Sequence, residues 1–543
     1  MRQRITYIHE AQGKFDPDQL TLTDNSLSVR SLHAAREERA TFGFKELPQE
    51  LWQVLKQCHE LHIRWSSHHT YDAVPPFASR VSPGLHVFYT PAVKGRSATL
   101  LCPLLRKVFD DGLKCEVPET SFISPPILST RFASTSSLQF HQLLPSLAEL
   151  VTYIQQKICP LLGDADTDKA CIAHATSILT ADSVDIDYDS ISHALTVSGY
   201  WSQHPQDRWS ETIRKREENA GKVEVGVLAM ERARLAEELS VGGFLAVVGE
   251  DKKLQPTLFS FPARHHPLPE TSTYAISFPP PTGLHPTLHL SIPRTAIIGP
   301  PSTAPPSSSC ALHTYLTLPS PLFADKHQLS TSDPLFLSSH NLVALRAIAG
   351  ETDLEAPDWV TERWGSNLLL ELATPSPSNN DVANHEENWQ ITIPLHLRYL
   401  PPSPTGYRNI SVTWPIVFWA CTAEEGTKMG INPFDRVGMG WEGLFGARTM
   451  FYQLTPDVSG KVGVDGEGKE RGVMIEQIEV PVLKLREGGE GSGSGLWGGR
   501  KGIEMGTVIV VVLGFLWVLG KLAGVVRTGG VGKGQDGERE KKE

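Results

Sequence analysis

A long apolar run near the C-terminus constrains this 543-residue chain more than any other feature of its sequence. Residues 506–520 carry no charge, and after Lys521 a second apolar stretch continues to Val526. A helix over 506–526, at about 1.5 Å per residue, is about 30 Å long, which matches the hydrocarbon core of one bilayer. The sequence therefore predicts one transmembrane helix, and the remaining chain must fold outside the membrane.

Lys521 is the charge that interrupts this apolar run. An ammonium group at the centre of a bilayer costs about 3 kcal/mol on insertion scales. Lys521 lies five residues before the end of the span, so its aliphatic stem can reach the headgroups. Alternatively it contacts a partner helix, whose close approach the spacing of Gly520 and Gly524 would permit.

The charges that flank the span predict its orientation. Five basic residues lie in the tail, 527–543, whereas the twenty residues before the span contain Arg486, Arg500 and Lys501. This excess predicts a cytosolic tail and a bulk N-terminal region in the lumen. The basic N-terminus is followed by no apolar h-region, so a cleavable signal peptide is not expected. The alternative is a tail-anchored protein whose large domain stays in the cytosol.

Composition narrows the class of the folded part. A formal charge of -11 over this length argues against a nucleic-acid binder, which would show a clustered basic surface. The 40 prolines and 45 glycines favour short strands and turns over a helical bundle. The seven cysteines form no C-x-x-C motif, which argues against zinc ribbons and thioredoxin-like sites. Their odd number leaves at least one without an internal partner, and whether and how the others pair stays open.

The pattern of apolar residues predicts an α+β protein of at least two folded parts. Residues 1–204 are expected to form an N-terminal α/β unit, with strand-like alternation at 20–23 and 61–65 and helical spacing at 46–58 and 143–162. Residues 205–480 are expected to form a β-sandwich-like domain, because short apolar runs recur there between turns rich in proline and glycine.

Several connecting segments are also expected from composition. The charged stretch 207–219 is expected to be helical, and residues 481–505, with the glycine-rich run 488–499, are expected to be a flexible tether to the membrane. Mobile loops are expected at 299–309, 374–387 and 457–472.

The motifs that could carry chemistry are weak. Residues 493–498 match G-x-G-x-x-G but follow no strand and lead into the membrane span, the reverse of a dinucleotide site. Residues 185–189 resemble the start of a calcium loop, but Ser190 and Thr196 occupy the positions that need glycine and glutamate. We therefore interpret the segment as a solvated acidic loop. Its Asp185 and Asp187 also form the D-x-D triplet of metal-dependent glycosyltransferases, which remains an alternative.

The remaining candidate site residues are several histidines and one asparagine. The pairs at 68–69 and 265–266, and His385, fit surface or turn positions better than metal ligands. No catalytic, cofactor-binding or metal-binding residue is therefore expected, and no cofactor. Asn409, in Asn-Ile-Ser, is an N-glycosylation sequon expected on a loop between Tyr407 and Val412.

Several longer segments resemble the PIG-X family, and specifically its fungal branch. The strongest similarity covers Pro394 to Pro402, Tyr407 to Pro415 and Phe418 to Cys421. Further segments are Gly283 to Leu288, Gly350 to Trp359, Asn432 to Arg436 and Gly443 to Gly446. The resemblance covers about 205–526 well, whereas the first 200 residues resemble the fungal members alone.

The resemblance implies a non-catalytic subunit of GPI-mannosyltransferase I, which adds the first mannose to the GPI precursor on the lumenal side of the endoplasmic reticulum. In that family a multi-pass, PIG-M-like partner carries the active site, and the PIG-X-like subunit stabilises it. The fungal branch is also implicated in folding of lumenal proteins, is N-glycosylated and lacks assigned catalytic residues. The competing hypotheses are a membrane-anchored, metal-dependent glycosyltransferase and a tail-anchored cytosolic scaffold.

Overall fold

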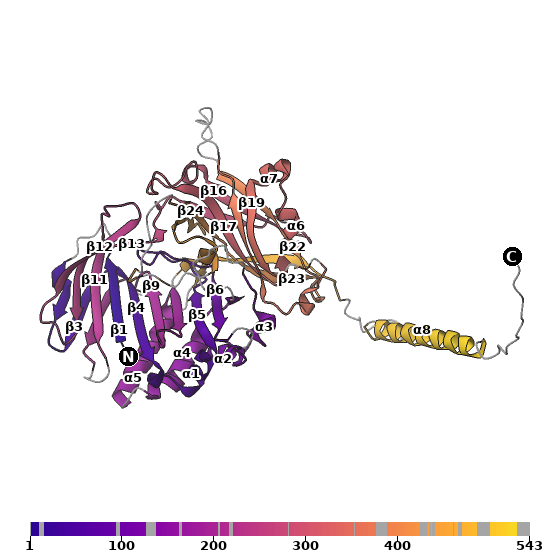
Figure 1. The fold of residues 1–543 in the computed structure, drawn as a ribbon, viewed down its shortest axis with the longest axis horizontal. Coiled ribbons are helices and arrows are strands. Elements are labelled where there is room, and N and C mark those ends of the chain that lie inside the picture. The colour runs from indigo at the N-terminus through magenta and orange to yellow at the C-terminus, as the bar shows by residue number, and fades with distance from the viewer. Residues whose placement is uncertain are drawn as a thin grey trace, which may run out of the picture. The chain divides into compact units, whose positions relative to one another are not determined.

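The computed structural model shows a protein built mainly of β-sheets, with a few helices (Figure 1). It describes residues 2–528 except 10–15, 94–97, 126–136, 162–164, 205–206, 217–220, 281, 352, 354, 376–387, 424–431, 435, 437–439, 460, 465–469 and 486–499. The chain divides into two units, one formed by Met1–Pro401 and Asn409–Pro481, the other by Pro402–Arg408 and Val482–Glu543. The α+β class expected from the sequence agrees with this mixture.

Ten strands form the largest sheet of the first unit, and the parallel pair β1–β11 joins two antiparallel runs of strands. The order across the sheet is β13 (Gln255–Pro262), β12 (Glu238–Val247), β11 (Val223–Glu231), β1 (Arg2–His9), β4 (Ala34–Gly43), β9 (Ala194–Trp201), β8 (Ser183–Asp189), β5 (Cys58–Ser66), β6 (Gly84–Pro91) and β7 (Leu138–Gln142).

Helices and a small sheet share a hydrophobic core with this large sheet. Leu61, Ile63 and Trp65 of β5 join that core, while Arg64 between them belongs to the opposite face, as the two-residue period of a strand requires. The helices that contribute to this core are α1 (Gln49–Leu55), α2 (Leu101–Val108) and α4 (Ala148–Tyr153). Two further helices lie in the same part of the chain, α3 (Pro118–Ser121) and α5 (Ala165–Thr176). The small sheet has the order β10 (Trp209–Arg214), β3 (Ser26–Leu32) and β2 (Leu20–Leu22).

Two further sheets of the first unit contribute to a second hydrophobic core. In β16, Leu288, Leu290 and Ile292 are buried and alternate with half-buried neighbours. The six-stranded sheet has the order β14 (His265–His266), β25 (Thr449–Gln453), β24 (Ile416–Thr422), β17 (Ser309–Pro319), β20 (Gly365–Leu372) and β19 (Leu342–Gly350). The four-stranded sheet has the order β21 (Asn388–Pro394), β16 (Thr287–Pro293), β15 (Thr273–Ser277) and β26 (Thr455–Pro456).

Short elements complete the described chain. Three strand pairs are β18 (Leu322–Phe323) with β22 (His396–Leu397), β23 (Tyr407–Thr413) with β29 (Ile475–Pro481), and β27 (Val462–Val464) with β28 (Glu470–Gly472). The remaining helices are α6 (Lys326–Leu329), α7 (Pro334–His340) and α8 (Arg500–Thr528).

The second unit contains α8, the apolar helix expected near the C-terminus. Its stretch Gly506–Ala523 has a mean hydropathy of 2.1, and none of it is buried inside the structure. Within the part of the chain that is described, this is the one helix long and apolar enough to cross a membrane.

The boundary expected at residue 204 does not separate two folded parts. Strand β1, at the N-terminus, pairs with β11, which begins at Val223, so the largest sheet uses chain from both sides of that position. The pairings of this sheet are antiparallel apart from β1–β11, so the first 204 residues are also not an α/β unit of βαβ crossovers. The pattern of apolar residues along the chain does not show which distant strands pair, so it could not reveal that the sheet crosses this position.

Three local predictions also need correction. The charged stretch expected to be helical contains β10, because Trp209 and Ile213 bury alternate side chains against the first core while the strand pairs with β3. The helix expected over 143–162 begins later, with α4 at Ala148, and then continues as a π-helix at Ile154–Ile158 and a 3-10 helix at Cys159–Leu161. The loop expected at 457–472 contains the hairpin strands β27 and β28. Residues 376–387 and 488–499 lie outside the described residues.

Candidate functional site

The Asp185–Asp189 segment is strand β8, not a solvated loop. Val184 and Tyr188 lie in the first hydrophobic core, so Asp185 and Asp187 belong to the opposite face of the sheet. Asp185 is 1 % exposed. Two aspartates on one face of a sheet could together bind a divalent cation. Whether they are free to do so depends on the groups that surround them.

Both aspartates already have polar partners within the protein, arginines for Asp185 and a histidine for Asp187. The Arg64 guanidinium, 1 % exposed, donates to Asp185, and the Nε of Arg436 lies 3.4 Å from the other oxygen of that carboxylate. His62 Nδ1 lies 3.0 Å from Asp187 Oδ1. Burial raises the pKa of Asp185, but Arg64 and Arg436 outweigh burial and lower it below its usual value. Asp185 is therefore the anionic centre of a buried ion-pair cluster.

A second buried carboxylate lies in the same region. Glu442, 3 % exposed, accepts a hydrogen bond from the Ser79 hydroxyl and lies 3.2 Å from His265 Nε2. Burial raises the pKa of Glu442, whereas the charges and hydrogen bonds of His265, Arg64 and Ser79 together lower it to about 2. The segment from 432 to 444 thus contributes Arg436 and Glu442 to a charged layer that faces β5 and β8.

Further polar contacts hold the N-terminal strands to the rest of the first unit. Arg471 Nη1 donates to Asp182 Oδ1 at 2.9 Å, and the Trp364 indole donates to the Gln139 carbonyl at 2.9 Å. We call the set of contacts that joins the largest sheet to the chain beyond residue 300 the junction; its ionic members are Arg64, Asp182, Asp185, Arg436, Glu442 and Arg471. Because these groups are buried, removing one partner leaves an uncompensated charge in the interior.

The histidine pairs were expected at surface or turn positions, and one member of each pair is instead buried, His69 and His266. His265 and His266 form β14 and pair with β25, and the His266 ring donates to the Ala263 carbonyl at 2.8 Å. Burial lowers the pKa of His266 to about 4, so it is neutral at pH 7. His69 is buried beside the half-buried His68, and His385 lies outside the described residues. Among the residues that are described, no group of three or more His, Cys, Asp or Glu is arranged to hold a metal ion.

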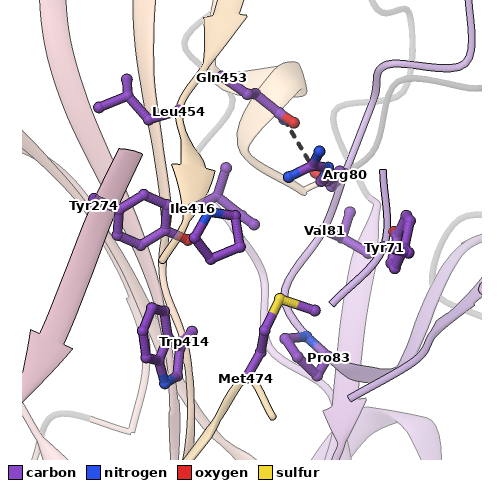
Figure 2. Close-up of a pocket in the computed structure, with 11 residues that line it drawn as sticks. Tyr71, Arg80, Val81, Pro83, Tyr274, Trp414, Ile416, Gln453, Leu454 and Met474 are labelled. Atoms are coloured by element: carbon purple, nitrogen blue, oxygen red, sulfur yellow. Dashed lines mark hydrogen bonds between the residues drawn. The ribbon is translucent and has the colours of Figure 1, made fainter. Parts of the chain in front are cut away.

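A small cavity lies within the junction (Figure 2). It is lined by Tyr71 and Arg80 from the chain between β5 and β6, and by Tyr274, Trp414 and Gln453 from the β-rich part. Its free volume is about 10 Å³, roughly the space of one water molecule. The Trp414 indole nitrogen and the Gln453 carbonyl oxygen are buried without a hydrogen-bond partner in the structure. This cavity suits a bound water and is too small for a sugar or a nucleotide.

Three disulfides pair six of the seven cysteines, a pairing that the sequence left open. Cys102 bonds to Cys115, Cys159 to Cys171 and Cys310 to Cys421, while Cys58 is buried as a free thiol. The first two close loops of 13 and 12 residues, and the third closes one of 111 residues. Closing the longest loop restricts the unfolded chain most, in the chain-entropy account of disulfide stability.

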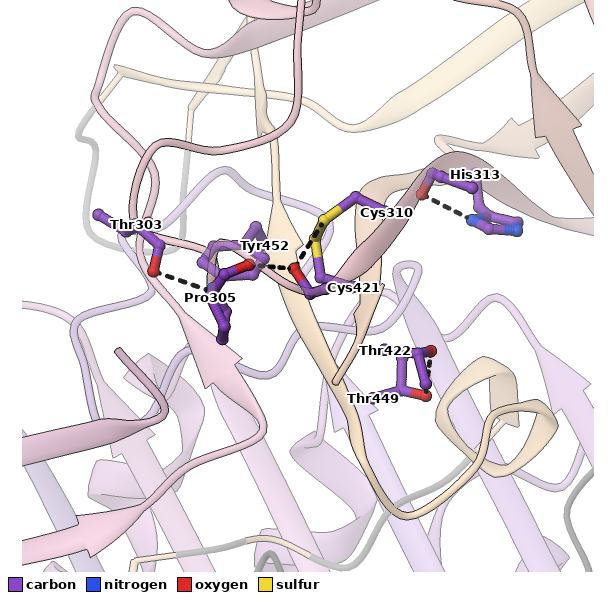
Figure 3. The surroundings of a disulfide bond; sticks show 10 residues. Thr303, Pro305, Cys310, His313, Cys421, Thr422, Thr449 and Tyr452 are labelled. Atoms are coloured by element: carbon purple, nitrogen blue, oxygen red, sulfur yellow. Dashed lines mark hydrogen bonds between the residues drawn. A yellow bond between two sulfur atoms is a disulfide. The ribbon is translucent and has the colours of Figure 1, made fainter. Parts of the chain in front are cut away.

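The Cys310–Cys421 bond joins neighbouring strands of the six-stranded sheet, β17 and β24 (Figure 3). The Ser308 hydroxyl lies 3.4 Å from Cys310 Sγ and donates to the Pro305 carbonyl at 2.7 Å. The Tyr452 hydroxyl donates to the Thr303 carbonyl at 3.4 Å. Of the mobile loop expected at 299–309, residues 299–308 are non-strand chain and Ser309 begins β17. The segment is tied to the sheet beside the disulfide by these hydrogen bonds.

The sequon lies on a strand instead of the expected loop. Asn409 is an exposed residue of β23, whereas its neighbour Ile410 is buried in the second core. The Ser411 hydroxyl accepts a hydrogen bond from Gln477 of β29 at 2.7 Å. The Asn409 side chain is therefore on the accessible side of the strand pair.

Comparison with known proteins identifies related chains along the whole length. A family profile described as PIG-X / PBN1 matches residues 281–523. The chain is 61% identical to a protein named pbn1 of Emericella nidulans, over 98% of this chain and 97% of that one. It is 54% identical to pbn1 of Aspergillus oryzae over all of both chains, and 39% identical to pbn1 of Neurospora crassa over 98% and 96%.

We expect Asp185→Ala to lower the free energy of unfolding by about 3–5 kcal/mol, because it leaves Arg64 and Arg436 buried without their anion. The matched variant Asp187→Ala should cost about 1 kcal/mol or less, since Asp187 and His62 are partly exposed. Denaturant unfolding of the detergent-solubilised protein measures both. If both substitutions lowered the free energy of unfolding by a similarly small amount, the ion-pair role of Asp185 would be contradicted and the glycosyltransferase hypothesis would be open again.

We also expect one accessible thiol after denaturation without a reductant, and seven after reduction, because Cys58 alone is outside the disulfides. Maleimide labelling counted by mass spectrometry measures this. In the Cys58→Ala variant we expect no labelled thiol without a reductant and six labelled thiols after reduction. More than one labelled thiol in the unreduced wild-type protein would rule out at least one of the three bonds.

Proposed function

The chain belongs to the PIG-X / PBN1 family, and from this membership we propose that it is a non-catalytic subunit of GPI-mannosyltransferase I in the endoplasmic reticulum. In this proposal it stabilises the multi-pass, PIG-M-like catalytic subunit that adds the first mannose to the GPI precursor. The observation that carries the proposal is sequence identity of 61% along 98% of the chain to a member of that family.

The proposed arrangement places the first unit in the lumen. Residues 506–526 span the membrane, 527–543 are cytosolic, and 481–505 connect the span to a lumenal body whose facing sheets form a β-sandwich-like domain. The three disulfides support the lumenal side, because disulfides persist in oxidising compartments and are rare in the cytosol. That observation favours this orientation over the tail-anchored cytosolic scaffold.

A structural role also accounts for the chemistry of the interior. Asp185 of the D-x-D triplet is buried and paired with Arg64 and Arg436, so its carboxylate is not left to bind a metal–sugar nucleotide complex, and Asp187 contacts His62. A body of this kind acts by binding the folded form of its partner, which shifts that partner's folding equilibrium by about 2.7 kcal/mol at a hundredfold excess over Kd. Anchoring both proteins in one membrane raises the effective concentration without adding contacts.

Deleting the gene for this chain should lower the steady-state amount of the mannosyltransferase, because the unbound partner spends more time unfolded and is degraded. Immunoblotting of the epitope-tagged catalytic subunit, with its messenger RNA as the reference, measures the change. Normal amounts of the enzyme together with normal addition of the first mannose would refute the proposed function.

The orientation has its own test in sealed microsomes. Asn409→Gln should abolish a mobility shift on deglycosylation, while Asn388→Gln, an exposed asparagine outside any sequon, should leave it unchanged. Protease added outside should leave the first unit intact. Digestion of that unit without detergent would contradict the lumenal orientation, whatever the state of Asn409.

A further inference from the structure

Three exposed apolar side chains lie on two neighbouring segments of the β-rich part of the first unit. Trp359 and Val360 are 61 % and 60 % exposed, and Tyr399 is 68 % exposed. The Asp358 amide donates to the Tyr399 carbonyl at 3.0 Å, so the two segments are neighbours. We call Trp359, Val360 and Tyr399 the aromatic patch. Single exposed apolar residues are ordinary, but adjacent tryptophan and tyrosine are the residues that most often dominate binding at protein interfaces.

A buried arginine holds the segment that precedes this patch. Arg398 is 2 % exposed, and its guanidinium donates to three backbone carbonyls, those of Glu351 at 3.2 Å, Asp353, and Ala356 at 2.8 Å. It also lies 4.3 Å from the ring of Phe323. One side chain therefore fixes the path of the chain that leads to Trp359.

Two further contacts fix the chain on either side of Trp359. The Ser320 hydroxyl donates to Asp358 at 2.6 Å, immediately before the patch. Five residues beyond Trp359, the Trp364 side chain is 6 % exposed and its indole donates to Gln139 in the junction. Trp359 is thus exposed on a segment whose backbone is held in place on both sides. Such a preorganised surface loses less conformational entropy when it binds a partner.

The charges around the patch select the kind of partner. The chain from 351 to 363 carries five carboxylates and one arginine, Arg363, and counting the buried Arg398 as well leaves an excess of three negative charges. The carboxylates are Glu351, Asp353, Glu355, Asp358 and Glu362. Surfaces that bind membranes surround their tryptophans with lysine and arginine, and this surface has the opposite charge.

We propose that the aromatic patch with its acidic surroundings is the docking surface for a basic segment of another protein that carries an apolar anchor. The proposal rests on the proposed function, and it identifies the occupant as a lumenal loop of the multi-pass mannosyltransferase. The anchor packs on Trp359 and Tyr399, while the carboxylates steer and orient the basic residues of the loop.

Site-specific photocrosslinking in microsomes tests the occupant directly. A photoreactive phenylalanine analogue replaces Trp359 in the full-length protein, and the control carries it at Leu335, which is 79 % exposed on α7. We expect a crosslink from position 359 to the mannosyltransferase and none from position 335. A crosslink from position 359 to lipid, or equal crosslinks from both positions, would overturn the proposal.

Co-purification of full-length variants separates this inference from the proposed function. Trp359→Ala combined with Tyr399→Ala should reduce recovery of the mannosyltransferase by about tenfold or more, as for central aromatic anchors. The pair Glu355→Lys and Glu362→Lys should reduce it and weaken its dependence on salt, whereas Leu335→Ala should not reduce it.

The outcomes are distinguishable. Recovery by the wild-type protein with unchanged recovery by the aromatic double variant would overturn the docking surface and leave the proposed function standing. Failure of the wild-type protein to recover the mannosyltransferase would overturn the proposed function and, with it, the named occupant. Because all five substituted residues are exposed, an unchanged unfolding midpoint verifies that a loss of recovery reflects lost binding.

Discussion

The buried ion pair between Arg64 and Asp185 is the interaction on which the arrangement of the first unit depends. The two residues face each other across β5 and β8, and Arg436, far along the chain, adds a second cation to the same carboxylate. Burying an unpaired ion in the protein interior costs several kcal/mol of folding free energy. Each of these charged groups can therefore be buried only when its partners are in place. The charges thereby select one mutual placement of segments that hydrophobic packing alone would specify less sharply.

This constraint gives the first 204 residues a structural role. They contribute seven strands to the largest sheet, and the parallel pairing of β1 with β11 and the contacts of Trp364 and Arg471 join them to the remaining chain. In the function proposed above, such cooperativity matters because the whole folded unit then supports the proposed docking surface. Arg398 and Trp364 show this locally, since both hold the chain on which Trp359 is exposed.

Secondary structure could be predicted from the sequence where it depends on neighbouring residues, and could not be predicted where it depends on contacts with residues far along the chain. The strands at Thr287, Asn367 and Val223 follow from apolar runs between turns, and β16 shows the expected alternation. The stretch at 207–219 was misassigned as helix because its charge pattern conceals the alternation of Trp209 and Ile213. Asp185 was misassigned as solvated because nothing near it in sequence reveals Arg64 or Arg436; an arginine within the apolar run 61–65 was the available signal.

By itself the sequence determined the apolar helix at 506–526, the predominance of short strands and the family to which the chain belongs. Each of these depends on composition or on the order of neighbouring residues. Only the tertiary structure decided that the sheet continues past residue 204, which cysteines pair, and that the D-x-D carboxylates are bound by Arg64 and His62. The physical reason is that the D-x-D carboxylates and the edge of β1 are satisfied by groups more than a hundred residues away in sequence, and the free energy of these contacts depends on distance in space.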